Sequence, residues 1–242
     1  MNTEKRGLIY QLLGIGAAFA VLVIWLVNAN LTETEQQTLD PATIWGYTLD
    51  HLKITVISAV IVLIIAIPLG ILLTRPAFRK AAPAVRAVAN FGQAAPAIGV
   101  VVLLAFWLGF GPNTAIVSLV IYAILPVLSN TIVGLQQVDE RLVEAGRGIG
   151  MSQSAVLFKV ELPLAVPVML SGIRTALVLL VGTATLATFI NGGGLGILIT
   201  TGVNLNLNAV LIAGSILVAL LALTIDWLGR VVEQLARPKG LS

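Results

Sequence analysis

The chain has 242 residues, of which 58% are hydrophobic and only 10% are charged, with a formal net charge of +3. A soluble globular domain carries about 25% charged residues, so the composition excludes that class. Apolar runs of about 20 residues are long enough to cross a hydrocarbon core of about 30 Å as helices. They lack the alternating pattern of an outer-membrane barrel. The predicted fold class is therefore an all-α membrane protein with several spanning helices.

The first long apolar run, from Leu8 to Val27, is typical either of a secretory signal peptide or of a first transmembrane helix. We favour the helix because 20 residues exceed the usual apolar core of a signal and the cleavage site is weak. The following connection, from Leu31 to Asp50, is acidic and contains no Lys or Arg. It is predicted to lie outside the cytoplasm.

Five further spans are predicted, which makes six in all. A tight turn around Gly109–Asn113 makes the third and fourth spans antiparallel neighbours, and a long polar stretch separates the fourth from the fifth. The predicted ranges are Ile54–Leu73, Ala87–Phe110, Thr114–Leu135, Val168–Ile190 and Ala209–Leu228.

The positions of the basic residues set the topology, because cytoplasmic loops carry an excess of Lys and Arg. With both termini in the cytoplasm, only Lys53 and Arg174 among the 14 basic residues fall outside cytoplasmic segments. The others are Lys5, Arg6, Arg75, Arg79, Lys80, Arg86, Arg141, Arg147, Lys159, Arg230, Arg237 and Lys239. Cytoplasmic amino and carboxyl termini are therefore predicted.

The sequence contains few of the residue types and motifs that carry out catalysis. It has no cysteine and one histidine, His51, which excludes thiol catalysis and cysteine or histidine metal clusters. No segment matches the phosphate-binding pattern G-x-x-x-x-G-K-[ST], so the chain itself is not expected to hydrolyse ATP. The glycine run Gly192–Gly196 is interpreted as a flexible or tightly packed helix terminus. No catalytic residue, cofactor, metal or nucleic-acid partner is predicted.

Polar residues inside the spans are candidates for a solute pathway. Asn90, Gln93, Ser129 and Asn130 either line such a pathway or form interhelical hydrogen bonds, which require the same residue types. Arg174 and Asp226 either pair with each other or anchor their helices at the cytoplasmic interface. No carboxylate is expected near mid-membrane, which disfavours an ion-driven secondary transporter.

The polar stretch 139–163 is predicted to be an amphipathic helix-turn-helix at the membrane surface. A first helix begins at Asp139-Glu140, a glycine-rich break ends at Gly150, and a second helix runs from Ser152 and stops before Pro163. The small residues Ala145 and Gly146 would let another protein approach the helix backbone. Glycine at the break permits a turn that L-residues resist, and a proline is expected to end the second helix.

The spacing within this stretch carries a family resemblance. Glu144-Ala145-Gly146, three residues, Gly150, nine residues and Val160-Glu161-Leu162-Pro163 resemble the E-A-A, G, I-x-L-P pattern of permease subunits of binding-protein-dependent ABC importers. Gly146 and Val160 depart mildly from that pattern. The resemblance implies a type I ABC importer permease fold in which this loop is a coupling helix on the ATPase subunit. The coupling residues it implies are Glu144, Ala145, Gly146, Gly150, Met151, Leu162 and Pro163.

The resemblance also implies the partners and the division of the chain. The expected partners are a cytoplasmic ATP-binding subunit, an extracytoplasmic solute-binding protein, a second permease subunit and membrane lipid, all at the bacterial cytoplasmic (inner) membrane. We expect an additional transmembrane helix at 1–30, an extracytoplasmic loop at 31–46, a permease domain at 47–229 with the coupling loop 139–163, and a cytoplasmic tail at 230–242.

Further segments resemble one branch of the family. The runs Gly148–Ser152, Lys159–Val168, Gly172–Thr175 and Gly182–Thr185 look like the osmoprotectant branch, which imports glycine betaine, choline or carnitine. The alternatives are another small polar solute such as methionine, a phosphonate or a sulfonate, and a membrane anchor that docks an ATPase without transport. The few aromatic residues form no recognisable cage for a quaternary ammonium, so selection is expected on the separate binding protein.

Overall fold

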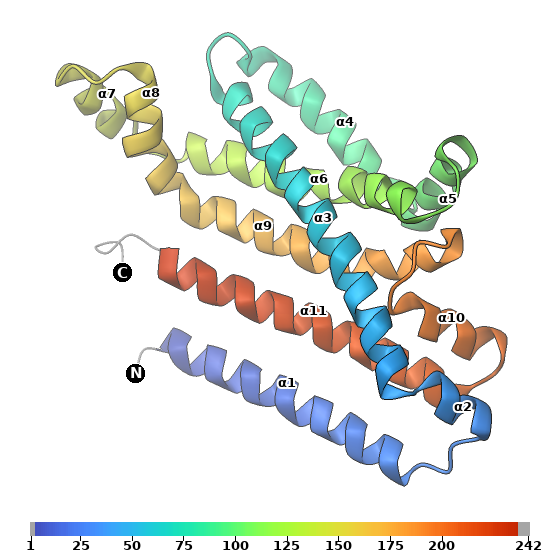
Figure 1. Cartoon of the computed structure of the whole chain (residues 1–242). Helices are drawn as coiled ribbons and strands as arrows, with labels where there is room; N and C mark the ends of the chain where they lie inside the picture. Colours follow the sequence, from blue (N-terminus) through green and yellow to red (C-terminus); the bar gives the residue numbers. More distant parts are fainter. Residues whose placement is uncertain (1–2, 237–242) are drawn as a thin grey trace.

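The computed structural model describes residues 3–236, and every regular element among them is helical (Figure 1). Arg237 and Lys239 of the predicted basic tail lie outside the described residues. The helices are α1 (Thr3–Asn28), α2 (Glu33–Thr38), α3 (Pro41–Thr74), η1 (Arg79–Ala81), α4 (Ala82–Ala94), α5 (Ala97–Leu108), α6 (Pro112–Gln136), α7 (Glu140–Gly148), α8 (Gln153–Val156), η2 (Leu157–Glu161), α9 (Leu162–Ala184), η3 (Thr185–Ile190), α10 (Gly196–Asn204) and α11 (Asn208–Ala236).

Five continuous helical segments are long and apolar enough to cross a membrane: Arg6–Asn28, Pro41–Thr74, Pro112–Gln136, Gln153–Ile190 and Asn208–Ala236. Two further helical segments, which contain α4 and α5, pass the same test only together and would make a sixth span. The predicted class of an all-α membrane protein is confirmed.

The third predicted span has a different shape from the expected one. We expected a single helix over Ala87–Phe110, but the chain bends by 96° between the segments of α4 and α5. Ala95 is extended, with ψ of 146°, and Pro96 follows it. A proline disfavours the helical conformation of the residue before it and cannot donate a backbone hydrogen bond. The bend is therefore a direct consequence of Pro96.

The second spanning helix begins earlier than predicted. The side chain of Asp40 accepts hydrogen bonds from the backbone N–H groups of Ala42 and Thr43, and Pro41 occupies the first turn. These are strong helix-start features. Thus the segment 31–46, predicted as a loop, contains α2 and the first turns of α3. At 34 residues, α3 is about 50 Å long and extends beyond the hydrocarbon core.

The centre of the molecule is α6, which packs against both α3 and α9. Glycines allow these close contacts: a Cβ at Gly70 of α3 would lie 2.8 Å from Thr131 Cβ, and one at Gly172 of α9 would lie 2.7 Å from the Pro126 carbonyl oxygen. On the other side, α11 packs against α9 and α10, and α1 packs on α11 (Figure 1).

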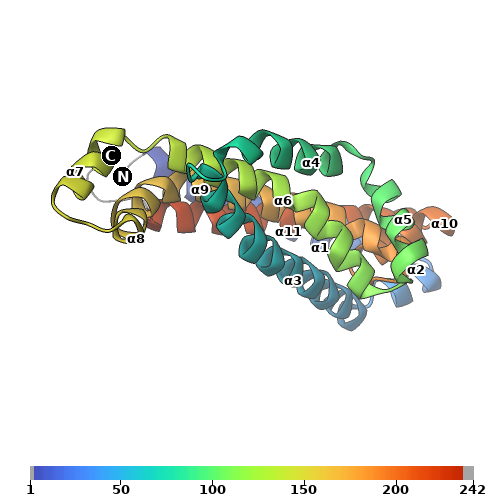
Figure 2. The same cartoon turned by 90° about the horizontal axis from the view of Figure 1, so that it is seen from above.

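The connecting elements gather at two opposite ends of the bundle. The start of α1, the end of α11, α7 and α8 lie toward one end, and α2, α5 and α10 lie toward the other (Figures 1 and 2). We call the first of these the α7 end and the second the α10 end.

His51 fixes the connection between η3 and α10 at the α10 end. This fully buried ring contacts the Val181 carbonyl oxygen through Nε2 at 3.0 Å, and the backbone N–H of Leu195 donates to Nδ1 at 3.2 Å. The hydrogen-bond pattern assigns the ring proton to Nε2. Gly194, with φ of +92°, lies directly against the imidazole. The glycine run is thus a tightly packed helix terminus, one of the two alternatives expected from the sequence.

Candidate functional site

The loop between α6 and α9 begins with a capped helix and a defined turn. Asp139 accepts a hydrogen bond from the backbone N–H of Arg141 at 2.9 Å and starts α7. At the other end, Gly150 N–H donates to the Arg147 carbonyl and Met151 N–H to the Gly146 carbonyl. This pair of bonds, with φ of +86° at Gly150, is a Schellman motif. The predicted first helix and the glycine break at Gly150 are both confirmed.

The second half of the loop does not end where the sequence predicted. Ser152 caps α8 through the backbone N–H of Ala155, but the helix continues through η2 and past Pro163 into α9. The single π-helical turn of η2 explains this difference, since Leu162 N–H bonds to the Leu157 carbonyl five residues back. A widened turn makes room for a proline ring that would clash in a regular helix. Residues 153–190 therefore form one continuous helical segment.

Gly146 has a role other than the one expected from its small size. It is buried, and a Cβ there would lie 3.4 Å from both Met151 Sδ and Val156 Cγ2. Gly146 therefore faces α8, where a Cβ would make ordinary contacts, and the expectation that Gly146 admits a partner's backbone is wrong. Ala145, one residue earlier, is exposed.

The exposed side of α7 is apolar at its centre. Leu142 is 48% exposed, Ile149 is 82% exposed, and Ala145 lies between them. Spacings of three and four residues place these three side chains on one helical face. Large exposed apolar side chains outside the spanning helices are typical of protein interaction sites. Leu142 and Ile149 were not among the residues predicted from the sequence, although their spacing was visible there.

The loop is tied to α3 by an ion pair that the sequence did not reveal. Arg75, which caps the carboxyl end of α3, donates from Nη2 to Glu161 Oε2 at 2.5 Å and from Nη1 to Oε1 at 3.2 Å. The Glu161 side chain is only 7% exposed and that of Arg75 31% exposed. Two parallel bonds of this kind fix orientation as well as distance. Glu161 occupies the variable position of the I-x-L-P pattern, so the family resemblance gave it no role.

The four candidate pathway residues lie on two helices. Asn90 is exposed and Gln93 half-buried on α4, whereas Ser129 and Asn130 are half-buried on α6. Asn130 Nδ2 donates to the Pro126 carbonyl at 2.9 Å, and the side chain packs against Gly172. None of the four lines the apolar cavity of about 450 Å³ between α3, α4 and α6. Asn130 therefore lies at the contact between α6 and α9.

Arg174 and Asp226, the two ionisable groups inside predicted spans, lie close together. Arg174 Nε is 3.7 Å from Asp226 Oδ1, and Nη1 is 3.5 Å from Glu233 Oε2. Asp226 also accepts hydrogen bonds from Arg230 Nε at 2.9 Å and Gln11 Nε2 at 3.0 Å. The cluster therefore links α1, α9 and α11. Between residues 3 and 236, no group of three or more His, Asp and Glu residues could hold a metal ion.

Comparison with known proteins connects this geometry to a family. Residues 66–238 match the profile of the family described as binding-protein-dependent transport system inner membrane component. The chain is 43% identical over 192 residues to the glycine betaine/carnitine/choline transport system permease protein OpuCB of Bacillus subtilis, covering 79% of this chain and 88% of the relative. It is 40% identical over 194 residues to the choline transport system permease protein OpuBB of the same organism, covering 80% and 88%.

A third relative comes from another bacterium. The osmoprotectant import permease protein OsmY of Salmonella typhimurium is 43% identical over 184 residues, covering 74% of this chain and 78% of the relative. Among solved structures, an inward-facing form of the MetNI methionine ABC transporter aligns with a TM-score of 0.72 and 23% identity, covering 86% of this chain and 100% of that one. That likeness shows a type I ABC importer permease fold. The chain belongs to the family of binding-protein-dependent transport system inner membrane components.

Proposed function

We propose that the chain is a permease subunit of an ATP-driven importer and that its loop 139–163 docks a separate cytoplasmic ATP-binding subunit. The observation that carries this proposal is the exposed apolar face of α7, formed by Leu142, Ala145 and Ile149 at the α7 end. The face is small and flanked by the exposed charged residues Glu144 and Arg147. An apolar centre with a polar rim is the usual composition of a protein interface.

Apart from its direct continuation from α6, the loop has two firm connections to the spanning helices. Helix α8 continues without a break into α9, and Glu161 is held by Arg75 at the end of α3. A displacement of the docked α7 therefore reaches α3 and α9 together. Because both helices pack on α6, the expected response is a rigid-body movement of the three, which is a common form of switching.

The orientation of the protein follows from the charges at the two ends. Arg75, Arg79 and Arg147 lie in segments at the α7 end, whereas Glu33 and Asp40 lie in segments at the α10 end. The positive-inside rule therefore supports an α7 end, with both chain termini, on the cytoplasmic side of the inner membrane. A reporter fused after Asn208 should be extracytoplasmic and one fused after Gln137 cytoplasmic. The reverse pattern would contradict this orientation.

The relatives' substrates support a quaternary-amine osmoprotectant such as glycine betaine, choline or carnitine. The two Bacillus relatives and the Salmonella relative are named for these solutes or for osmoprotectants in general. Aromatic residues make up only 6% of the chain, and cation–π recognition of a quaternary amine requires several together. We infer that a separate binding protein selects the solute and that two permease subunits form the pathway.

The test is reconstitution of the complete transporter with its ATP-binding subunit and binding protein in proteoliposomes. Uptake of labelled betaine or choline, but not methionine, is the expected result. Methionine uptake would favour the other small solutes considered from the sequence, and ATPase binding without any uptake would favour the anchor. Within this system, Ile149→Glu should weaken ATPase binding, whereas Leu235→Glu, equally exposed but on α11 outside the loop, is the matched control. Equal effects would contradict docking through α7.

A further inference from the structure

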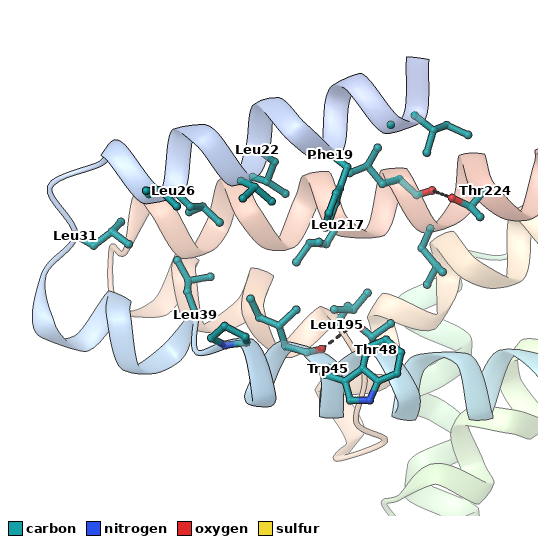
Figure 3. A pocket seen from close by; sticks show the side chains of 18 of the residues that line it. Phe19, Leu22, Leu26, Leu31, Leu39, Trp45, Thr48, Leu195, Leu217 and Thr224 are labelled. Carbon is teal, nitrogen blue, oxygen red and sulfur yellow. Dashed lines mark hydrogen bonds between the residues drawn. The ribbon is translucent and has the colours of Figure 1, made fainter. Parts of the chain in front are cut away.

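A large apolar cavity lies between α1, α3 and α11. Its volume is about 940 Å³, and its lining comes almost entirely from leucine, isoleucine, valine and aromatic side chains (Figure 3). Leu22 and Leu26 of α1 face Leu217 of α11 across it, and Trp45 of α3 lies at its edge. The cavity runs along α1 from Leu12 to Val27, which is about 22 Å of helix.

The three hydroxyl and amide side chains in the lining already donate to backbone carbonyls close to them in the chain. Thr48 Oγ1 donates to the Ile44 carbonyl at 2.8 Å, Thr224 Oγ1 to the Leu220 carbonyl at 2.7 Å, and Gln36 Nε2 to the Leu31 carbonyl at 3.2 Å. An apolar cavity does not hold water, and an empty space of this size forfeits the packing energy of its walls. The lining therefore fits a hydrocarbon occupant.

The depth of the cavity in the membrane indicates the source of such an occupant. Helices α1, α3 and α11 are all long and apolar enough to span a membrane, so the cavity lies at the depth of the bilayer core. Leu31 and Leu39 line the cavity at the α10 end (Figure 3), and we call these two residues the end wall. Glu35 holds that wall in place, because its Oε1 accepts the backbone N–H of Ala209 at the start of α11.

Toward the α7 end the lining reaches Thr224 (Figure 3) and, on α1, Leu12. Arg6 and Arg230 are exposed and lie six residues beyond these two positions, or about 9 Å along each helix. At the same level, Gln11 bonds to Asp226, and Trp227 donates to the Leu8 carbonyl, so α1 and α11 are joined there. Arg230 also donates from Nε to Asp226 at 2.9 Å, but its side chain remains 51% exposed. Together with Arg6 it provides guanidinium donors beyond the apolar cavity that complement a phosphate attached to acyl chains.

We propose that this cavity binds a membrane phospholipid from the leaflet at the α7 end, with its acyl chains between α1, α3 and α11 and its phosphate near Arg6 and Arg230. A leaflet contributes about 15 Å of hydrocarbon thickness, so the 22 Å length of the cavity accepts the chains in full. The lipid completes the packing of α1, which otherwise contacts the bundle chiefly through α11.

The glycines of α1 provide a matched pair of variants. A Cβ at Gly16 or at Gly14 meets nothing within 4 Å, but only Gly16 lines the cavity. Full-length protein is purified from membranes of phosphatidylethanolamine and phosphatidylglycerol, and bound phospholipid is measured by native mass spectrometry. Wild type and Gly14→Phe should retain one phospholipid per chain, and Gly16→Phe should retain at least tenfold less. If Gly16→Phe does not insert, Gly16→Leu takes its place.

Three outcomes would overturn the proposal. Gly16→Phe could retain as much lipid as wild type, Gly14→Phe could lose as much as Gly16→Phe, or Gly16→Phe could change the oligomeric state while lipid retention stays constant. The last result would assign the cavity to a second copy of the chain. The headgroup is tested separately: Arg6→Gln should lower retention severalfold, whereas Lys53→Gln, at an exposed position on α3, should not. Equal retention by these two variants would contradict the phosphate position.

Discussion

Glu161, near the end of the loop 139–163, forms a two-pronged ion pair with Arg75 at the carboxyl end of α3, with N···O distances of 2.5 and 3.2 Å. The two residues are 86 positions apart in the chain, and their contact closes a loop that contains α4, α5, α6 and α7. It is the connection by which a movement of α7 would reach α3 directly. Without it, the loop would communicate with the bundle through α6 and α9 alone.

Separating this pair should weaken both the fold and the coupling. Hydrogen bonds to charged groups contribute about 1.5–3 kcal/mol, and Glu161 is nearly buried. Glu161→Ala is therefore expected to lower the unfolding midpoint and to reduce solute uptake per ATP hydrolysed severalfold. A double-mutant cycle with Arg75→Ala, measured by thermal unfolding, should give a coupling energy of about 1.5–3 kcal/mol. Glu140→Ala, exposed on α7, is the control, and additive effects of the two pair mutations would refute a direct interaction.

Gly150 should tolerate no side chain without a cost in backbone energy. Its φ of +86° lies in the left-handed region, although space is open around it. A left-handed conformation costs an L-residue about 1–2 kcal/mol, and the turn sets the angle between α7 and α8. Gly150→Val is expected to insert normally, bind the ATP-binding subunit less well, and hydrolyse ATP with reduced uptake.

Gly148, two residues earlier, provides a control that separates the effect of backbone conformation from the effect of side-chain size. Gly148 is helical and also has open space around its Cβ position, so Gly148→Val adds the same side chain without positive-φ strain. Proteoliposome uptake and ATPase rates of the two variants are compared directly. Normal uptake by Gly150→Val, or an equal loss in Gly148→Val, would show that the left-handed turn is not needed for coupling.

The sequence predicted those features that depend on neighbouring residues. Apolar length placed the spans, Asp139 marked the start of α7, and Gly150 marked its end. Pro96 disfavours a straight helix at its position, but the direction and size of a 96° bend depend on how α4 and α5 pack on the rest of the bundle. Pro163 misled the prediction because a single π-turn, which has no sequence pattern of its own, accommodates it.

The contacts between distant residues could not be predicted in the same way. Nothing near Glu161 indicates that Arg75 is its partner, and nothing near His51 indicates that it accepts from Leu195. Gly146 shows a related limit, since small size allows close approach from either side of a helix. Only the positions of Met151 and Val156 show that its own chain occupies the space.

Glu35 should make the stability of the α10 end depend on pH. The Thr32 backbone N–H, then the Thr32 hydroxyl and the Ala209 backbone N–H, hold the pKa of Glu35 below its ordinary value of 4.5, against the opposing effect of burial. These bonds favour the carboxylate in the folded state. The stabilisation is therefore fully present above pH 4.5 and is lost as the pH falls through the lower, folded-state pKa.

Thermal unfolding of wild type and Glu35→Gln between pH 7 and pH 3 measures this effect. The midpoint of the variant should be lower than that of wild type at pH 7, and the difference should shrink below pH 4.5. Glu33→Gln, exposed on the same helix, should follow the wild-type curve. A difference that stays constant down to pH 3 would show that the charge of Glu35 does not contribute.

Gly172 tests whether Asn130 acts by packing between α6 and α9, since its hydrogen bond to Pro126 lies within α6. A Cβ at Gly172 would press on the Asn130 side chain and lie 2.7 Å from the Pro126 carbonyl oxygen, so Gly172→Ala must push α9 away from α6. Overpacking of this kind costs about 1–3 kcal/mol. Gly182→Ala, exposed near the end of the same helix with nothing within 4 Å, should instead be neutral or stabilise by up to about 1 kcal/mol. Both are measured by thermal unfolding and uptake.

Asn130→Ala completes the comparison. If Asn130 acts by packing, this change removes its bond to the Pro126 carbonyl and lowers the unfolding midpoint, while the relative uptake of betaine and choline stays the same. It should leave most of the Gly172→Ala defect in place in the double variant, because alanine keeps the Cβ that lies nearest to the new methyl group and removes only the contact with Asn130 Cγ. A change in solute preference at an unchanged midpoint would instead assign Asn130 to the pathway.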